Sequence, residues 1–235
     1  MINLTQKPEE KQTLSKVIKL FIFLPLISLC IFLGVWQIER GQEKQDTYNL
    51  YLKNISKEPK ELHNLHENIS EFTKIKVFGD FMLEKQFLLD NQVYNQKAGY
   101  DVITPLEVDD KILLVNRGWV SNNNRQSIPD ISIVKTKNPI IGYVYYYKNS
   151  YMLSNDIYEN KWPLLIQSIN INKKSSLLNK EILPYVLIMN ESQDNAYNLK
   201  KIYKKNPQLK HYMYAGQWFI FSILGFIFMI ILMRR

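Results

Sequence analysis

One histidine lies where a long apolar stretch of the chain begins. His211 is followed by the aromatic residues Tyr212, Tyr214 and Trp218 within a run that carries no charge. An ionisable side chain at the mouth of a membrane helix is a default candidate for a functional site. A neutral imidazole can ligate haem iron, and aromatic rings beside it offer a flat apolar surface to a porphyrin. The other interpretation is that His211 is an amphipathic ring at the lipid headgroup boundary, and its residue type leaves both open.

The rest of the chain offers little chemistry for an enzyme. His63 and His66 are the imidazole bases of the central stretch, and both lie in a polar, linker-like segment. A hydrolase needs a nucleophile, a base and an orienting group within hydrogen-bond reach of each other. No nucleophile elbow, phosphate loop or dinucleotide-binding glycine pattern occurs. His63, His66 and Glu67 also lack the residue order of a zinc protease and a visible third ligand, so we predict a protein that is not an enzyme.

The single cysteine limits the metal chemistry further. Cys30 lies inside the first apolar run. The domain between the two apolar runs can therefore form no internal disulfide and no thiolate metal site. This excludes a copper chaperone that works with a pair of cysteines.

Two apolar runs, one near each end, predict membrane helices. Residues 20–36 are uncharged over 17 positions, and residues 212–233 are uncharged over 22. A helix that spans a bilayer needs about 20 mostly apolar residues. The first run ends at Trp36 without the small residues of a cleavage site, which favours an uncleaved anchor over a secretory signal. The predicted tails are residues 1–19 and 234–235, and residues 37–211 form the extramembrane domain.

The positive charge does not indicate nucleic acid. The net charge is +8, of which the two tails carry about half. Lysines cluster between positions 200 and 210, just before the second apolar run, where such a group is typical of a solvated face near lipid headgroups. We therefore predict the lipid bilayer as a partner and no nucleic acid. Basic residues flank both runs on both sides, so charge alone does not set the orientation in the membrane.

The sequence pattern of the central stretch predicts a β domain. Short β-branched and aromatic runs alternate with turn signals at intervals of about ten residues. The predicted strands are residues 74–81, 86–90, 100–106, 111–120, 139–147, 162–169 and 185–189, with a short helix at 170–180. Residues 37–52 are rich in helix formers and should continue the first membrane helix into water. The fold class is an α+β membrane protein, in which two transmembrane helices flank a mainly antiparallel β extramembrane domain.

Three residues of this β domain have expected local roles. Pro105 should close its strand, because proline cannot donate to a sheet. Gly118 should permit a special backbone angle or a close approach. Arg117 should be exposed at the end of the preceding strand. The tyrosine run at residues 145–147 is more typical of strand core and edge than of a ligand box.

Four sequence blocks together resemble the surfeit locus protein 1 family. The first is the segment Gly34-Val35-Trp36-Gln37-Ile38-Glu39-Arg40, and the second is Gly79-Asp80-Phe81. The third joins residues 99–105 to Val115-Asn116-Arg117-Gly118-Trp119-Val120. The last is the segment from His211 to Phe219, which contains the pattern His-x-x-Tyr-Ala-x-Gln-Trp. Each block is weak alone, and their order along the chain makes the set specific.

This resemblance implies a role in assembling haem-copper cytochrome c oxidase. It implies haem a as a transient cofactor, with His211 as the iron ligand and Trp36, Tyr214 and Trp218 packing the macrocycle. Trp36 and Arg40 serve equally well as interfacial anchors of the first helix. The expected partners are the oxidase catalytic subunit and other assembly factors, with Arg40, Arg117 and Trp119 as partner-binding candidates.

The resemblance also implies a location and leaves one rival function open. The tails would face the cytoplasm or matrix, and the domain would face the periplasm or intermembrane space. Glu9 and Glu10 in the first tail are unlike a transit peptide, so we predict the bacterial inner membrane, with the mitochondrial inner membrane as the alternative. The rival is a cofactor-free scaffold that docks and stabilises an oxidase intermediate.

Overall fold

The chain folds into two compact units. The computed structural model describes residues 8–61, 68–122, 129–135, 138–147, 161–200, 202–203 and 206–234, with side chains from residue 13. The first unit comprises Met1–Asn49 and Tyr203–Arg235, and the second comprises Leu50–Ile202. His63 and His66 lie outside the described residues.

Two long helices contain the predicted membrane segments. Helix α1 runs over Pro8–Ile55, and helix α3 runs over Gln208–Arg234. Because a helix rises about 1.5 Å per residue, α1 is far longer than a bilayer is thick. The prediction that the first membrane helix continues beyond residue 36 is confirmed, with its end three residues later than expected.

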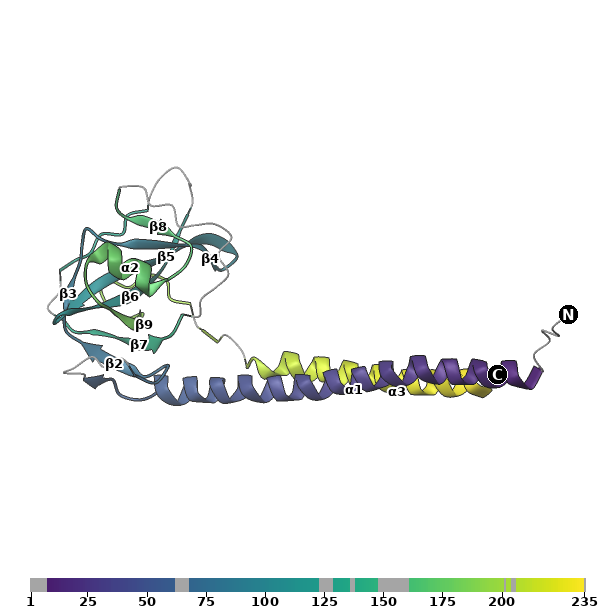
Figure 1. The fold of residues 1–235 in the computed structure, drawn as a ribbon. Helices are drawn as coiled ribbons and strands as arrows, with labels where there is room; N and C mark the ends of the chain where they lie inside the picture. Colours follow the sequence, from purple (N-terminus) through teal and green to yellow (C-terminus); the bar gives the residue numbers. More distant parts are fainter. Residues whose placement is uncertain are drawn as a thin grey trace. The chain divides into compact units, whose positions relative to one another are not determined.

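Within the first unit the two helices pack side by side and antiparallel (Figure 1). Lys19 donates to the carbonyl of Leu232, and at the other end of the pair Asn206 donates to Gln45. The contacting positions recur at alternating steps of three and four residues, the spacing of knobs-into-holes packing. The buried and half-buried positions with this spacing are His211, Ala215, Trp218, Ser222, Gly225 and Met229 on α3, and Phe23, Ile27, Cys30, Gly34, Gln37 and Gly41 on α1. Tyr212 and Phe219 flank the stripe on α3 and also contact α1.

Glycines let the two helices approach closely. A Cβ atom at Gly34 would lie 2.6 Å from Cε1 of Phe219, and one at Gly41 would lie 2.5 Å from Cε1 of Tyr212. Both are shorter than a van der Waals contact, so each ring occupies space that only a glycine leaves open. Small residues at helix contacts are typical of pairs that pack inside a membrane.

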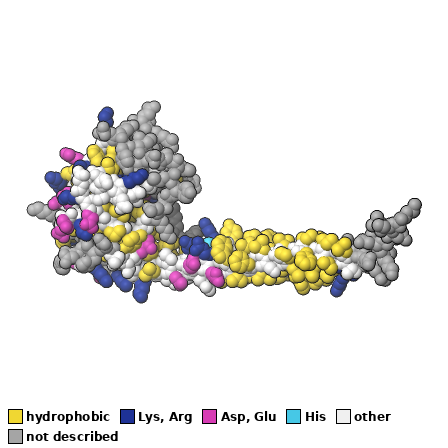
Figure 2. Space-filling view, in the orientation of Figure 1, with side chains coloured by type: hydrophobic (Ala, Val, Ile, Leu, Met, Phe, Trp, Pro, Cys, Tyr) yellow, Lys and Arg dark blue, Asp and Glu magenta, His cyan; other side chains and the backbone are white. Residues whose placement is uncertain are grey.

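The outward faces of this helix pair are apolar. Large side chains such as Phe21, Phe32, Phe221 and Phe228 are exposed, and Figure 2 shows hydrophobic residues along the pair. Both helices are long and apolar enough to cross a membrane. An apolar surface of this extent is unfavourable in water and matches the hydrocarbon of a bilayer. The predicted architecture of two terminal membrane helices around a β domain is therefore confirmed.

Nine strands in the described part of the second unit form one sheet. They are β1 (Lys60–Glu61), β2 (Lys74–Val77), β3 (Asp80–Phe81), β4 (Phe87–Tyr94), β5 (Lys97–Val108), β6 (Lys111–Ser121), β7 (Ile140–Tyr145), β8 (Leu164–Ile166) and β9 (Ile182–Met189). Helix α2 spans Ile171–Leu178, with the side chain of Asn170 capping its first turn. Every predicted strand, and the short helix, has a counterpart.

The sheet is mixed, with antiparallel pairs in the majority. Its order is β1-β2-β7-β9-β6-β5-β4-β8, and β3 pairs with β5 beside β4. Five pairs are antiparallel, and three are parallel, namely β1 with β2, β4 with β8, and β6 with β9. Among the described residues this order has two ends, β1 and β8, and the predicted mainly antiparallel β domain is confirmed.

Both faces of the central strands are buried. Ile112 and Leu114 of β6 belong to one hydrophobic cluster, and Leu113 and Val115 belong to another. Side chains of a strand alternate between the two faces of the sheet, so a nearly continuous apolar run marks a strand covered on both sides. Helix α2 packs against β9 on one of these faces (Figure 1).

Pro105 does not close its strand, and that expectation is wrong. It lies inside β5, where its register partner on β6 is Leu114. Its carbonyl accepts from Met82, so its nitrogen also faces the side of β5 that β3 and β4 share. The ladder is interrupted there between Phe81 and Phe87. The missing N–H therefore costs no strand hydrogen bond.

The segment Asn116-Arg117-Gly118 forms a bulge in β6. Between paired positions two residues of β6, Arg117 and Gly118, stand opposite the single residue Val102 of β5. Gly118 has a φ of +113°, which L side chains rarely adopt. The Asn116 side chain accepts from the Gly118 N–H at 2.8 Å and so holds the bulge. The predicted special backbone angle at Gly118 is confirmed.

We expect Gly118→Val to destabilise the β domain by about 3 kcal/mol, which lowers its melting temperature by about 6–12 °C. A Cβ atom here would lie 2.8 Å from the carbonyl carbon of Tyr197, in addition to the unfavourable φ. Thermal unfolding of the detergent-solubilised chain, followed by circular dichroism, measures the effect. Gly216→Val is the control, because a Cβ at Gly216 meets no atom within 4 Å. Equal melting temperatures for both variants would contradict the assignment.

Candidate functional site

His211 lies at the contact between the two long helices. Its Nδ1 atom is 2.8 Å from Oε1 of Gln37, although 174 residues separate the two in the chain. The His211 ring is half-buried. Because an amide oxygen accepts, Nδ1 carries the proton of the neutral ring, and Nε2 keeps its lone pair. Within the described residues no group of three His, Cys, Asp or Glu side chains could hold a metal ion.

The aromatic residues predicted to accompany His211 lie near it along the same helices. Tyr214 and Trp218 follow His211 by three and seven residues, which places them on one side of α3. Trp36 directly precedes Gln37 on α1. Trp36 is 43% exposed and Tyr214 is 52% exposed. The Trp36 and Tyr214 rings are therefore exposed on the surface of the helix pair, whereas Trp218 is half-buried.

Arg40 is the one predicted partner-binding residue that is exposed. It forms an ion pair with Glu43 one turn further along α1, and both side chains are largely open to solvent. Exposed pairs of this kind contribute about 0.2–1 kcal/mol. About half of the Arg40 side-chain surface, 48%, is exposed.

Arg117 is buried, which corrects the expectation that it is exposed. Its side chain has 1% of its surface accessible. It donates to Gln86 Oε1 at 3.0 Å, and to the carbonyl oxygens of Ile131, Ser132 and Asn195 at 2.9–3.1 Å. The guanidinium also lies 4.8 Å from the centre of the Tyr197 ring. Arg117 therefore joins β6 to segments that come much later in the chain.

The positive charge of Arg117 is stabilised by neutral hydrogen-bond acceptors. Among the described residues its partners are carbonyl, amide and hydroxyl oxygens, and none is a carboxylate. Burial lowers the pKa of the guanidinium, but an arginine starts so high that it stays protonated. A buried charge without hydrogen bonds is costly, and here each of the three guanidinium nitrogens donates to at least one oxygen.

Trp119, the third partner-binding candidate, is also buried, with 5% of its surface accessible. Its indole Nε1 donates to the carbonyl of Gln92, and its ring packs against Tyr94 at 5.3 Å. Its backbone N–H donates to Asn198. Arg117 and Trp119 thus support the interior of the domain rather than its surface.

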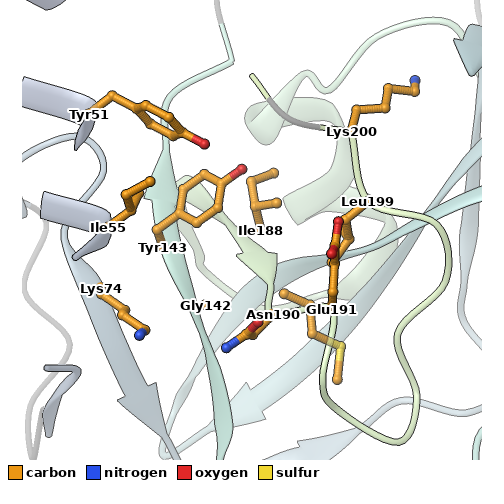
Figure 3. A pocket seen from close by; sticks show the side chains of 11 residues that line it. Tyr51, Ile55, Lys74, Gly142, Tyr143, Ile188, Asn190, Glu191, Leu199 and Lys200 are labelled. Atoms are coloured by element: carbon orange, nitrogen blue, oxygen red, sulfur yellow. The ribbon is translucent and has the colours of Figure 1, made fainter. Parts of the chain in front are cut away.

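A second candidate site is a groove lined by tyrosines in the β domain, which we call the tyrosine groove. It consists of two adjoining cavities of about 270 and 290 Å³ that share Tyr143, Ile188, Leu199 and Lys200. Tyr51 and Tyr143 turn their hydroxyls into the first cavity (Figure 3). The aromatic walls are Tyr51, Tyr143, Tyr145 and Tyr147. Of the tyrosine run at residues 145–147, the two outer residues therefore line a cavity, and Tyr146 packs against Tyr185.

The tyrosine groove has a charged end. Lys200 lies 2.9 Å from Asp101 Oδ1 and donates to Gln92 at 2.8 Å. That carboxylate oxygen has no hydrogen bond of good geometry, so its attraction to Lys200 is Coulombic. Asn116 joins the same end by donating to Tyr147 at 2.9 Å. Burial raises the pKa of Tyr143 and of Tyr147, so both phenols stay neutral at physiological pH.

The structure thus brings some predicted site residues together and separates others. His211, Trp36, Tyr214, Trp218 and Arg40 belong to the helix unit, whereas Arg117 and Trp119 belong to the β unit. Gln37 is the residue to which sequence reasoning gave no role. The feature that could have indicated a role for Gln37 is a polar amide within the apolar face of a membrane helix. That face is recognised as a helix contact only when its pairing with α3 is known.

The fold and site define a class: a β domain carried by two antiparallel membrane helices, with one histidine at the helix contact. The profile that describes the SURF1 family matches residues 24–223, and the chain belongs to this family. The predicted family resemblance is therefore confirmed.

Curated relatives with SURF1-like names come from bacteria and eukaryotes. The SURF1-like protein of Rickettsia bellii is 30% identical over 181 residues, which cover 75% of this chain and 72% of the relative. The SURF1-like protein of Rickettsia conorii is 26% identical over 224 residues, covering 92% and 91%. Surfeit locus protein 1 of Arabidopsis thaliana is 32% identical over 134 residues, covering 50% and 38%. Family membership supports a role in cytochrome oxidase assembly, as an assembly factor rather than a recognised enzyme.

Proposed function

We propose that this protein assists assembly of haem-copper cytochrome c oxidase by binding haem a and helping to place it in the catalytic subunit. The observation that carries the proposal is the state of His211: its Nδ1 atom is engaged by Gln37, which leaves the Nε2 lone pair for iron. Family membership supplies the oxidase context.

The residues around His211 suit a flat apolar cofactor. Trp36, Tyr214 and Trp218 would pack against the macrocycle. Trp36 and Tyr214 are exposed and Trp218 is half-buried, and aromatic rings on a membrane helix favour a flat apolar partner. Bound iron would supply a Lewis-acid centre for the Nε2 lone pair. A single protein ligand binds more weakly than two, which suits transient holding and release.

The proposal includes a location and partners. The two helices would anchor the chain in the bacterial inner membrane, or in the mitochondrial inner membrane as the alternative, with the β domain on the periplasmic or intermembrane-space side. The ends of α1 and α3 that flank the tails lie together, which is consistent with both tails on one side. Arg40 remains a candidate contact for the oxidase catalytic subunit or other assembly factors.

A cofactor-free docking scaffold is the second candidate function. The tyrosine groove favours it, since aromatic walls and a charged end are typical of surfaces that bind protein segments. In this alternative the β domain stabilises an oxidase intermediate, and His211 only anchors the helix.

Purification of the chain from a cell that produces oxidase with haem a separates the two candidates. We expect the detergent-purified protein to carry a Soret absorption band, with haem a identified by its pyridine haemochrome spectrum. Protein that accumulates normally and binds its oxidase partner without haem would replace the haem proposal with the docking scaffold.

A further inference from the structure

Gln37 and His211 come from the two sequence blocks at the ends of the chain, and the structure joins them. The 2.8 Å contact between Gln37 Oε1 and His211 Nδ1 lies within the helix pair. The first block contributes Gln37, next to Trp36, and the second block contributes His211. Neither block explains by itself why an amide lies in an apolar helix contact.

The glycines on either side of Gln37 let α1 and α3 come close enough for this contact. Gly34 precedes Gln37 by three residues, and Gly41 follows it by four, so all three lie on the face of α1 that meets α3. The Tyr212 and Phe219 rings pack where Cβ atoms of Gly41 and Gly34 would be, and the Cβ of His211 would lie 3.4 Å from a Cβ at Gly41. The two backbones are therefore close at the depth where Gln37 reaches His211.

We propose that Gln37 is a positioning residue that fixes the tautomer and orientation of the His211 ring, so that Nε2 is presented to haem iron. This inference rests on the proposed haem function. A histidine that ligates a metal usually donates its other ring N–H to an acceptor, which orients the ring and makes the ligand more basic. The Gln37 amide oxygen supplies that acceptor. Without it the ring can rotate and exchange tautomers, and the ligand weakens.

Two substitutions at Gln37 test this role in opposite directions. Gln37→Leu removes the acceptor at nearly constant size, and Gln37→Glu replaces it with a stronger one. We expect haem to leave the Gln37→Leu protein about 10–100-fold faster than the parent, measured by transfer to apomyoglobin. The reduction potential of the bound haem should rise in Gln37→Leu and fall in Gln37→Glu, because a more basic imidazole favours ferric iron.

Gln45→Leu is the matched control. Gln45 lies about two turns further along α1 and accepts from Asn206, two residues before α3, so the substitution also removes an amide contact between α1 and the chain at the start of α3. We expect its haem release and potential to equal those of the parent. If Gln37→Leu and Gln37→Glu also equal the parent in both measurements, while His211→Ala loses haem, the positioning role is wrong and the haem function stands. If His211→Ala keeps its haem, the haem function itself fails.

Discussion

Replacing Arg117 with methionine should unfold the β domain or lower its melting temperature by more than 10 °C. The substitution removes four donated hydrogen bonds of 2.9–3.1 Å, and a longer one to Thr104, from a side chain that is fully buried. Each buried acceptor left without a partner costs about 1–3 kcal/mol. A summed loss of about 4 kcal/mol or more is large against the total stability of a domain, about 5–15 kcal/mol.

Arg117→Lys should rescue little of this loss. A lysine keeps the charge but replaces the planar fork of the guanidinium with one nitrogen. The fork reaches Gln86 and Ile131 with one nitrogen, Ser132 with the second and Asn195 with the third. One ammonium cannot meet acceptors set that far apart. The variant should therefore melt closer to Arg117→Met than to the parent.

Arg40→Met is the control for both variants. It makes the same change at an arginine that is exposed and pairs with Glu43, so it should leave the melting temperature of the β domain within about 2 °C of the parent. Thermal unfolding by circular dichroism and pulse proteolysis of the purified chain measure all three. A folded Arg117→Met with the stability of Arg40→Met would show that the hydrogen bonds to Arg117 do not stabilise the domain.

The misjudged exposure of Arg117 illustrates what sequence reasoning lacked. An arginine after an apolar strand is exposed in most proteins, because burial of its charge is costly. Here the acceptors come from residues 131, 132 and 195, which are 14 to 78 positions away in the chain. Their spacing contains no pattern that links them to Arg117. The bulge at Gly118, in contrast, was predictable, since a glycine inside a β-branched run marks a special backbone position.

Strand positions were predictable from local pattern, and strand partners were not. The apolar run at residues 111–120 marks a central strand because both of its faces are covered. That β6 lies between β5 and β9, with β9 parallel to it, depends on a crossover through β7, β8 and α2. The position of Pro105 was mispredicted for the same reason. A proline is accommodated inside β5 because neither β3 nor β4 pairs with the strand at that residue, and the sequence does not show where those pairings end.

Part of the candidate haem site was likewise predictable from the sequence, and part was not. His211 and its aromatic neighbours were visible as residue types at the start of an apolar run. The role of Gln37 depends on a helix contact between residues 174 positions apart. The contact stripe on each helix has a regular spacing of three and four residues, but the sequence does not say which residue of one stripe meets which residue of the other.

His211→Ala should abolish haem binding while the protein still inserts and accumulates. Alanine is no harder to accommodate at a helix mouth than imidazole, so the membrane helices should form as in the parent. Gln37 would lose one half-buried hydrogen bond, which costs about 1 kcal/mol and leaves the glycine-mediated packing of Gly34 and Gly41 in place. Removal of the iron ligand, in contrast, leaves only apolar contacts to the macrocycle.

The measurement compares purified parent, His211→Ala and His63→Ala from cells that make oxidase with haem a. His63→Ala removes an imidazole from the stretch between the two membrane helices and should carry as much haem per protein as the parent. We expect His211→Ala to lack a Soret band and the cell's oxidase to contain less haem a, with equal amounts of all three proteins in the membrane. His211 is the one histidine among the residues that the structure describes, so its removal leaves no described imidazole at the helix contact. Haem that copurifies with His211→Ala at the parent level would therefore mean that the family role is carried by docking, through surfaces such as the tyrosine groove.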